Sequence, residues 1–236
     1  MKIIPENRNL SWNEFLNSSV VIEEISKIES ILKNEAFFPE TNNILRFLNM
    51  NPNNIKCVVV GMEPYPTDYE LNGEKTPIAT GRSFEVANVT SWSQKFKQSS
   101  LRNILKAVYF ESTGVSKSLD SIRSEIENGT YKISQPKSWF DGMESQGVLF
   151  LNAALTVKQY QVNTHSKIWE TFMNELIQFT EAKSQPRWLL FGKDAQKRVL
   201  PFIDIDRASC TCHPRLSEFV KERPFKDISD KINIVI

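Results

Sequence analysis

The sequence predicts an α/β fold: a three-layer α/β/α sandwich around a central four-stranded, mainly parallel sheet. Short apolar runs alternate with longer segments of helical periodicity, an order typical of parallel strands joined by helices. The runs are rich in β-branched and aromatic residues, as strands buried on both faces are. Because the 236 residues show no internal repeat and no low-complexity linker, we expect one domain over residues 1–236.

The amino-acid composition and the net charge limit the classes of protein to which the chain can belong. Apolar residues make up 40% and charged residues 24%, which is ordinary for a globular protein. The net charge of +1 means that a nucleic-acid partner would have to meet a local basic rim. No apolar run approaches the roughly 18 residues of a membrane span, and residues 1–9 lack the apolar core of a signal peptide. We therefore expect a cytoplasmic protein that does not associate with membranes, and nothing indicates more than a monomer.

Four apolar runs are the predicted strands, and two of them end at a glycine. The first ends at Gly61 and the third is stopped by Gly192. In chain order they cover residues 56–61, 148–151, 188–191 and 208–212.

The segments between the strands are predicted to be helical where apolar residues recur at near-helical spacing. A long loop rich in proline and glycine should follow the first strand, and residues 112–135 read as a polar, partly helical excursion. Gly147 and Pro201 are expected to end the helices that precede them. The predicted helices cover residues 11–34, 42–48, 100–110, 119–127, 136–146, 166–181 and 194–200.

The clearest helical pattern lies in residues 166–181. Ser166 is a plausible N-cap for this helix. One stripe of the helix is apolar and should belong to the core. Its members are Trp169, Phe172, Met173, Leu176 and Ile177.

The three cysteines could be read as part of a metal site. Cys210 and Cys212 precede His213 directly, but only Cys57 or His165 could supply a fourth zinc ligand. The alternative is an alternating strand that places Cys210 and Cys212 on one face. The odd number of cysteines favours reduced thiols. We therefore predict no metal and no cofactor.

Polar residues follow each predicted strand at the point where it ends. Parallel α/β sheets bind ligands at the carboxyl ends of their strands, so these segments should meet at one edge. They bring together a carboxylate, an aromatic ring, an amide, a lysine, an imidazole and an arginine, which suits an enzyme acting on a polar planar ligand. The segments are residues 61–66, 152–154, 192–193 and 213–217.

Five segments in order resemble those of the uracil-DNA glycosylase superfamily, closest to its uracil-excising branch. They are Gly-Met-Glu-Pro-Tyr-Pro at 61–66, Gly-Arg-Ser-Phe at 81–84, residues 149–157, residues 188–197 and His-Pro-Arg-Leu-Ser at 213–217. The resemblance extends over roughly residues 10–225. It implies hydrolysis of the bond between base and deoxyribose in uracil-containing DNA, with the base first flipped from the stack. It also makes a proteinaceous glycosylase inhibitor a candidate partner.

The resemblance implies a role for each residue of the base pocket. Phe84 would stack on the flipped base and Asn152 would read its edge, because an amide offers a donor and an acceptor together. Tyr65 would exclude the 5-methyl group of thymine, and the backbone of Met62 would help to cradle the base.

The resemblance also implies the catalytic and DNA-contacting groups. Glu63 would orient the attacking water, and His213 would hydrogen-bond the departing uracil anion. Leu216 would fill the gap in the stack as an apolar wedge. The candidates for contacts with the DNA backbone are Ser99, Ser100, Gly192, Lys193, Arg215 and Ser217.

Four departures mark the chain as a divergent member. Glu63 stands where the family usually has aspartate, and Pro66 replaces a histidine. The loop at 213–217 is one residue shorter than usual, and the phosphate-contacting segment at 97–100 lacks the family's prolines. These departures leave open a DNA-binding protein without efficient catalysis, or a glycosylase for another base such as hypoxanthine.

Overall fold

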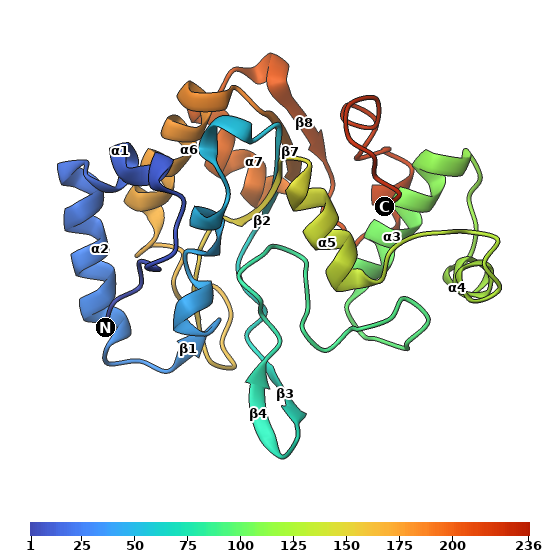
Figure 1. Cartoon of the computed structure of the whole chain (residues 1–236), viewed down its shortest axis with the longest axis horizontal. Coiled ribbons are helices and arrows are strands. Elements are labelled where there is room, and N and C mark those ends of the chain that lie inside the picture. Colours follow the sequence, from blue (N-terminus) through green and yellow to red (C-terminus); the bar gives the residue numbers. More distant parts are fainter.

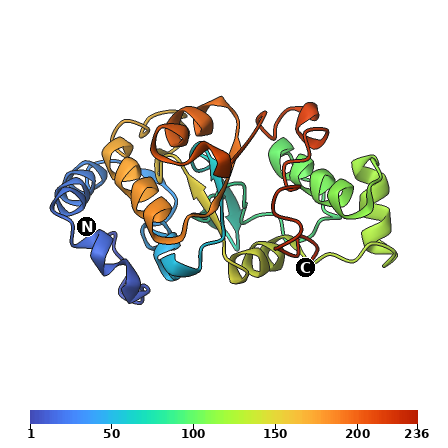
Figure 2. The ribbon, with the colours of Figure 1, turned by 90° about the horizontal axis from the view of Figure 1, so that it is seen from above.

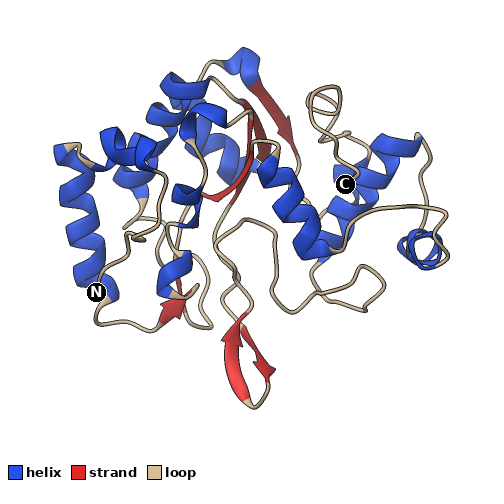
Figure 3. Cartoon of the chain, in the orientation of Figure 1, coloured by secondary structure: helices blue, strands red, loops and turns tan.

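The computed structural model describes all residues from Met1 to Ile236. Its central sheet is formed by β2 (Cys57–Gly61), β5 (Val148–Asn152), β7 (Arg187–Phe191) and β8 (Ala208–Thr211). The strand order is β5-β2-β7-β8, and all three pairings are parallel. Figure 3 shows the sheet at the centre, surrounded by helices. The predicted four strands and the α/β class are confirmed.

The two faces of the sheet are covered by separate hydrophobic cores. Alternate residues of β2 divide between them, with Val58 and Val60 in one core and Cys57 and Val59 in the other. The first core is closed by α1 (Asn13–Leu16), α2 (Ser19–Leu32), α6 (Glu170–Ser184) and α7 (Lys193–Val199). The second is closed by α3 (Ser99–Thr113), α4 (Leu119–Glu127), α5 (Pro136–Ser145) and the C-terminal segment. Figures 1 and 2 show these two groups of helices on opposite sides of the sheet.

Two predicted helices are wrong in detail. The helix expected over 11–34 is interrupted, because Ser18 is extended (ψ 134°) and separates α1 from α2. The helix expected over 42–48 is replaced by two short 3₁₀ turns, Thr41–Asn43 and Arg46–Asn49. Further 3₁₀ turns lie at Leu10–Trp12, Pro52–Asn54, Leu200–Phe202, Ile205–Arg207 and Ser217–Val220.

The helix predicted over 166–181 begins later than expected. Its first α-helical residue is Glu170 and Trp169 occupies the N-cap position, so Ser166 is not the cap. Turn-like backbone bonds from Trp169 to His165 and from Glu170 to Lys167 fill the intervening stretch. The apolar stripe of this helix is buried in the core, as predicted.

Two small sheets were not predicted. β1 (Phe37–Phe38) pairs with β6 (Val157–Lys158), and β3 (Asp68–Leu71) pairs with β4 (Glu74–Pro77), both antiparallel. The β3–β4 hairpin turns at Asn72 and Gly73, which both have positive φ, and it projects from the body of the molecule (Figure 1). No helix combines the length and apolarity needed to cross a membrane.

Candidate active site

The carboxyl ends of β2 and β5 form the floor of the candidate site. Gly61 pairs with Asn152 across the two strands, and the Ala153 amide donates to the Gly61 carbonyl at 2.9 Å. A Cβ atom at Gly61 would lie 2.8 Å from Oδ1 of Asn152 and 3.3 Å from Cζ of Phe84. Only glycine therefore permits the amide of Asn152 and the ring of Phe84 to meet at this point.

Phe84 is held in an uncommon conformation. Its φ is 65°, which is unfavourable for a bulky side chain, and its side chain is 7% exposed. The ring lies 5.8 Å from the ring of Phe191 and 6.3 Å from that of His213, measured between centroids. Backbone outliers of this kind persist where the surrounding structure enforces them, and they cluster at functional sites.

Arg82 anchors the segment that carries Phe84. Its buried guanidinium bonds Glu85 at 3.1 Å and Asp141 at 2.8 Å, and it also pairs with Glu144. Burial works against the charge, but the hydrogen bond to Glu144 and the neighbouring carboxylates outweigh it and raise the pKa of Arg82. No sequence pattern indicated this anchoring role of Arg82.

Asn152 is a strongly enclosed polar residue of the site and is only 3% exposed. Its amide is not among the fully buried side-chain groups that lack a partner, so it reaches solvent. Its donor and acceptor are therefore available for a complementary ligand. Tyr65 follows β2 and packs against the second core, and burial raises the pKa of its phenol to about 12.

Glu63 lies beyond the end of β2 and points toward the loop at 158–165. Both of its carboxylate oxygens accept from the backbone N–H of Asn163, at 3.0 and 2.9 Å. Burial raises the pKa of Glu63, and the Asn163 N–H partly offsets this. The sequence offered no signal for this contact, because it is made by a main-chain group.

His213 lies at the end of β8, directly against Gly192. A Cβ at Gly192, whose φ is 99°, would come within 3.1 Å of Cβ of His213. Nδ1 of His213 accepts the N–H of Arg215 at 3.1 Å, so the proton of the neutral ring is on Nε2. Burial, and next the charge of Arg215, lower the pKa of His213, while Asp194 opposes them. The ring is therefore a neutral donor near pH 7.

The loop at 213–217 is fixed by one side chain from α3. Nδ2 of Asn103 donates to the carbonyls of Pro214 at 2.7 Å and Leu216 at 3.1 Å. The side chain of Leu216 remains 44% exposed, so it is not a leucine packed into the core. Asn103 is a further residue whose role the sequence did not indicate.

A cleft of about 820 Å³ is lined by His213 and by residues of the loop that follows it, whereas Glu63, Tyr65, Phe84 and Asn152 are not among its lining residues. Met62 and Phe191 contribute apolar surface to it, and so do Cys210 of β8 and Cys212 directly after this strand. Its lining also includes Gly192, Lys193, His213, Arg215 and Leu216. The structure thus brings together the predicted residues that follow three different strands.

The remaining predicted DNA contacts differ in exposure. Lys193, Arg215 and Ser217 are exposed around the cleft. Ser99 and Ser100 begin α3, which packs on the turn at Ser217–Val220. Ser99 is partly exposed, whereas Ser100 is only 8% exposed and offers little surface.

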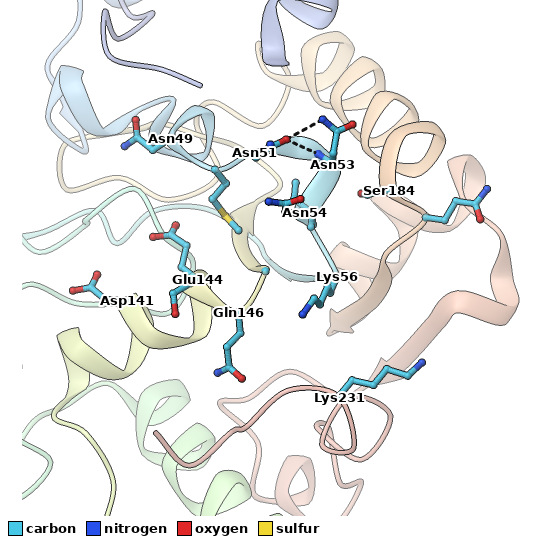
Figure 4. A pocket seen from close by; sticks show the side chains of 15 residues that line it. Asn49, Asn51, Asn53, Asn54, Lys56, Asp141, Glu144, Gln146, Ser184 and Lys231 are labelled. Atoms are coloured by element: carbon cyan, nitrogen blue, oxygen red, sulfur yellow. Dashed lines mark hydrogen bonds between the residues drawn. The ribbon is translucent and has the colours of Figure 1, made fainter. Parts of the chain in front are cut away.

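The opposite edge of the sheet carries a larger cleft, of about 920 Å³. Figure 4 shows its polar lining, which includes Asn49, Asn51, Asn53, Asn54, Lys56 and Lys231. Asp141 and Glu144 also line it, but their carboxylates already bind Arg82. This cleft lies at the amino ends of the strands, where α/β sheets do not place their ligand sites.

Only Cys210 lies in a strand, because β8 ends at Thr211 and Cys212 follows it, so the predicted strand over 208–212 is one residue too long. Cys210 is exposed, Cys212 is partly exposed, Cys57 is buried, and all three thiols are free. No group of three or more histidine, cysteine, aspartate or glutamate side chains in the chain could hold a metal ion.

A parallel sheet with an enclosed amide, an imidazole and a carboxylate at its carboxyl edge is typical of an α/β enzyme. No protein-family model matches the chain. A uracil-DNA glycosylase of Helicobacter pylori strain Shi470 is 30% identical over 199 residues, covering 81% of this chain and 76% of the relative. Another, of Aliivibrio salmonicida, is 26% identical over 226 residues, covering 92% and 87%. The chain therefore belongs to the uracil-DNA glycosylase family, whose members are DNA-repair hydrolases.

Solved structures agree with this assignment at the level of the fold. The structure of a UNG from Nitratifractor salsuginis superimposes with a TM-score of 0.76 at 21% identity, covering 98% of this chain and 93% of that one. Mimivirus uracil-DNA glycosylase gives a TM-score of 0.65 at 21% identity, covering 90% and 70%.

Proposed function

We propose that the chain hydrolyses the N-glycosidic bond of deoxyuridine in DNA. The observation that carries this proposal is the unpaired amide of Asn152 beside the ring of Phe84, above Gly61. Such a pair can stack on a flipped base and read its edge at the same time. Uracil presents a carbonyl and a ring N–H that match the donor and acceptor of an amide, whereas cytosine presents the reverse pattern. Tyr65 would exclude the methyl group of thymine.

The reaction proposed for this site breaks the bond between C1′ and N1, and the electron pair leaves with the base. Nε2–H of His213 would donate to O2 of uracil as negative charge develops there. Glu63 would orient a water molecule whose oxygen bonds C1′ and whose proton the carboxylate accepts. The base leaves as the uracil anion and takes a proton from solvent. This scheme requires no metal or cofactor.

Binding must also extract the base from the stack, at a cost of about a few kcal/mol. Leu216 would fill the resulting gap, which its exposure and the hold of Asn103 on its loop support. Lys193 and Arg215 would contact phosphates around the cleft, with Ser217, Gly192, Ser99 and Ser100 as further candidates.

The rim that meets DNA is also the surface that a proteinaceous glycosylase inhibitor could recognise. Similar mimivirus UNG variants have been solved in complex with UGI, one with a TM-score of 0.61 to this chain. We expect the chain to act as a cytoplasmic monomer.

The test is cleavage of an oligonucleotide that contains one deoxyuridine, with alkali to break the strand at abasic sites. The wild-type chain would be compared with Glu63→Gln and Asn152→Ala, and with Asn54→Ala as an exposed asparagine at the opposite edge. We expect cleavage at uracil but not at thymine or hypoxanthine. We expect this cleavage to be lost in the first two variants and kept in the third.

Two results would contradict the proposal. Cleavage at hypoxanthine in preference to uracil would show that the pocket recognises a base other than uracil. Binding of DNA with no cleavage at any base would identify a DNA-binding protein that has lost catalysis, which the engagement of Glu63 by Asn163 would then explain.

A further inference from the structure

The carboxylate of Glu63 is held by a loop from the other side of the site. The N–H of Asn163 lies 3.0 Å from one of its oxygens and 2.9 Å from the other. Asn163 adopts a φ of 59°, a conformation that asparagine tolerates and β-branched residues do not. The direction of this N–H therefore depends on a local backbone geometry that the loop must maintain.

The loop is tied to the segment that follows Glu63. The amide of Tyr160 donates to the carbonyl of Pro66 at 2.7 Å, and the Tyr160 hydroxyl bonds Asp68 at the base of the hairpin. Within the loop, the amide of Lys158 donates to Oγ1 of Thr164 at 3.0 Å. These bonds fix the two segments relative to each other.

A buried polar chain anchors the end of the loop. His165 is 1% exposed, and its ring bonds Oγ1 of Thr156 at 2.8 Å and Oε2 of Glu35 at 3.0 Å. Trp169 donates to the same Thr156 oxygen at 2.7 Å, and Lys158 pairs with Glu35 at 2.8 Å. Thr156, His165 and Trp169 are buried and bonded to one another, whereas Glu35 and Lys158 at the outer end are partly exposed. Hydrogen-bonded buried groups of this kind are held rigidly.

We propose that the loop at 158–165 is a positioning element for catalysis and that the Asn163 N–H sets the place of the Glu63 carboxylate. This inference rests on the proposed function. It also explains the glutamate, because the additional methylene group allows the carboxylate to reach the loop from the end of β2. An aspartate at position 63 would fall short of this N–H.

The contact also affects ionisation of the carboxylate. Burial raises the pKa of Glu63 and the Asn163 N–H lowers it, and no charged side chain contributes. Loss of the N–H therefore raises the pKa of Glu63 further, so that a larger share of the enzyme is protonated and inactive at mildly acidic pH.

The experiment compares Asn163→Val with Asn163→Gly in the full chain. Valine disfavours the left-handed backbone at position 163 and should displace the N–H. Glycine tolerates this backbone and should keep the N–H in place. For Asn163→Val we expect kcat to fall about tenfold to a hundredfold, since small misplacements of catalytic groups have effects of this size. The acid limb of its kcat profile should move to higher pH, while Asn163→Gly should retain the wild-type pKa of Glu63.

Two controls separate positioning from folding. Asn72→Val places the same substitution at a left-handed asparagine in the hairpin turn (φ 54°), and we expect it to leave the pH profile unchanged. In a Glu63→Asp background, Asn163→Val should cause no additional loss, because the shorter carboxylate does not reach the N–H.

NMR titration of the Glu63 carboxyl group measures its pKa, and so it tests the contact with the Asn163 N–H independently of activity. An unchanged titration of Glu63 in Asn163→Val would overturn the inference, and so would an equal loss of kcat in the glycine and valine variants. If the wild-type chain removes no uracil, the proposed function fails, but a raised pKa of Glu63 in Asn163→Val still supports the contact.

Discussion

The two halves of the carboxyl edge of the sheet are built differently. Beyond β2 and β5, Asn152 and Phe84 are buried, and Glu63 is bonded to the chain around it. Beyond β7 and β8, Lys193, Arg215 and Leu216 are exposed. The first half is thus organised before a ligand arrives, and the second half presents charge and apolar surface to solvent.

This difference assigns different tasks to the two halves. Buried polar groups discriminate strongly, because an ill-matched ligand leaves them unpaired. Exposed cations act over a distance and are screened by salt. His213 lies between the two halves: it follows β8 and packs on Gly192 after β7, but its ring approaches the ring of Phe84 in the first half. Substitutions on the two sides should therefore affect different kinetic parameters.

The largest effect in this comparison is expected for His213→Ala. Loss of a preorganised donor at developing charge typically lowers kcat by about 10²–10³-fold. We expect a fall of this size in single-turnover excision of uracil, with DNA affinity nearly unchanged. If His213→Ala instead weakens mainly the affinity for DNA, His213 contributes to DNA binding, like the residues of the exposed half.

Leu216→Ala should have a smaller effect that depends on the substrate. Without the wedge, the gap in a duplex stays unfilled, so excision from duplex DNA should fall about tenfold. Excision from single strands should change much less. Leu10→Ala is the matched control, because this leucine is 69% exposed and distant in sequence from the site. Equal losses on both substrates would argue against a wedge.

Lys193→Ala should change the salt dependence of binding. If Lys193 contacts one phosphate, the slope of log affinity against log salt should decrease by about 1, with kcat at saturating DNA unchanged. Lys231→Ala removes an exposed lysine at the opposite edge and should leave the slope as it is. Identical slopes for wild type and Lys193→Ala would show that Lys193 does not contact a DNA phosphate.

The sequence was most informative where burial dictates residue type. β2 and β7 are buried on both faces, so their apolar runs identified them and the residues at their ends. The β3–β4 hairpin was missed although Asn72-Gly73 is a strong turn signal, because prolines and glycines around it suggested a loop. The break at Ser18 carries no glycine or proline to mark it.

The candidate site was predictable for side chains and not for main-chain groups. Asn152 ends β5 and His213 follows β8, so their positions at this edge could be predicted from the strand pattern, whereas the roles expected of them came from the family resemblance. The Asn163 N–H has no signature in the sequence, because any residue except proline carries one. Asn103 looked like one polar residue among others on an amphipathic helix, since its carbonyl partners come from a distant loop.

The smallest expected effect is on the free energy of unfolding, to which His165 and His213 should make separate, pH-dependent contributions. Burial lowers the pKa of His165 below its ordinary value of 6.5, although Glu35 opposes the shift. The folded state then binds fewer protons than the unfolded state between the lowered pKa and pH 6.5, so stability decreases as pH falls through this window. One proton limits the slope to about 1.4 kcal/mol per pH unit.

His165→Gln should flatten the dependence of the unfolding free energy on pH between about pH 5.5 and 7.5, where carboxylates titrate little. Urea unfolding at several pH values measures this slope. The slope that remains should come from His213, whose pKa is lowered by burial and by Arg215, and His213→Gln should remove that part. Each substitution should remove only the part of the slope that its own histidine contributes, so the double variant His165→Gln, His213→Gln should show little slope in this range. A slope that survives in the double variant would assign the pH dependence to groups other than the two histidines.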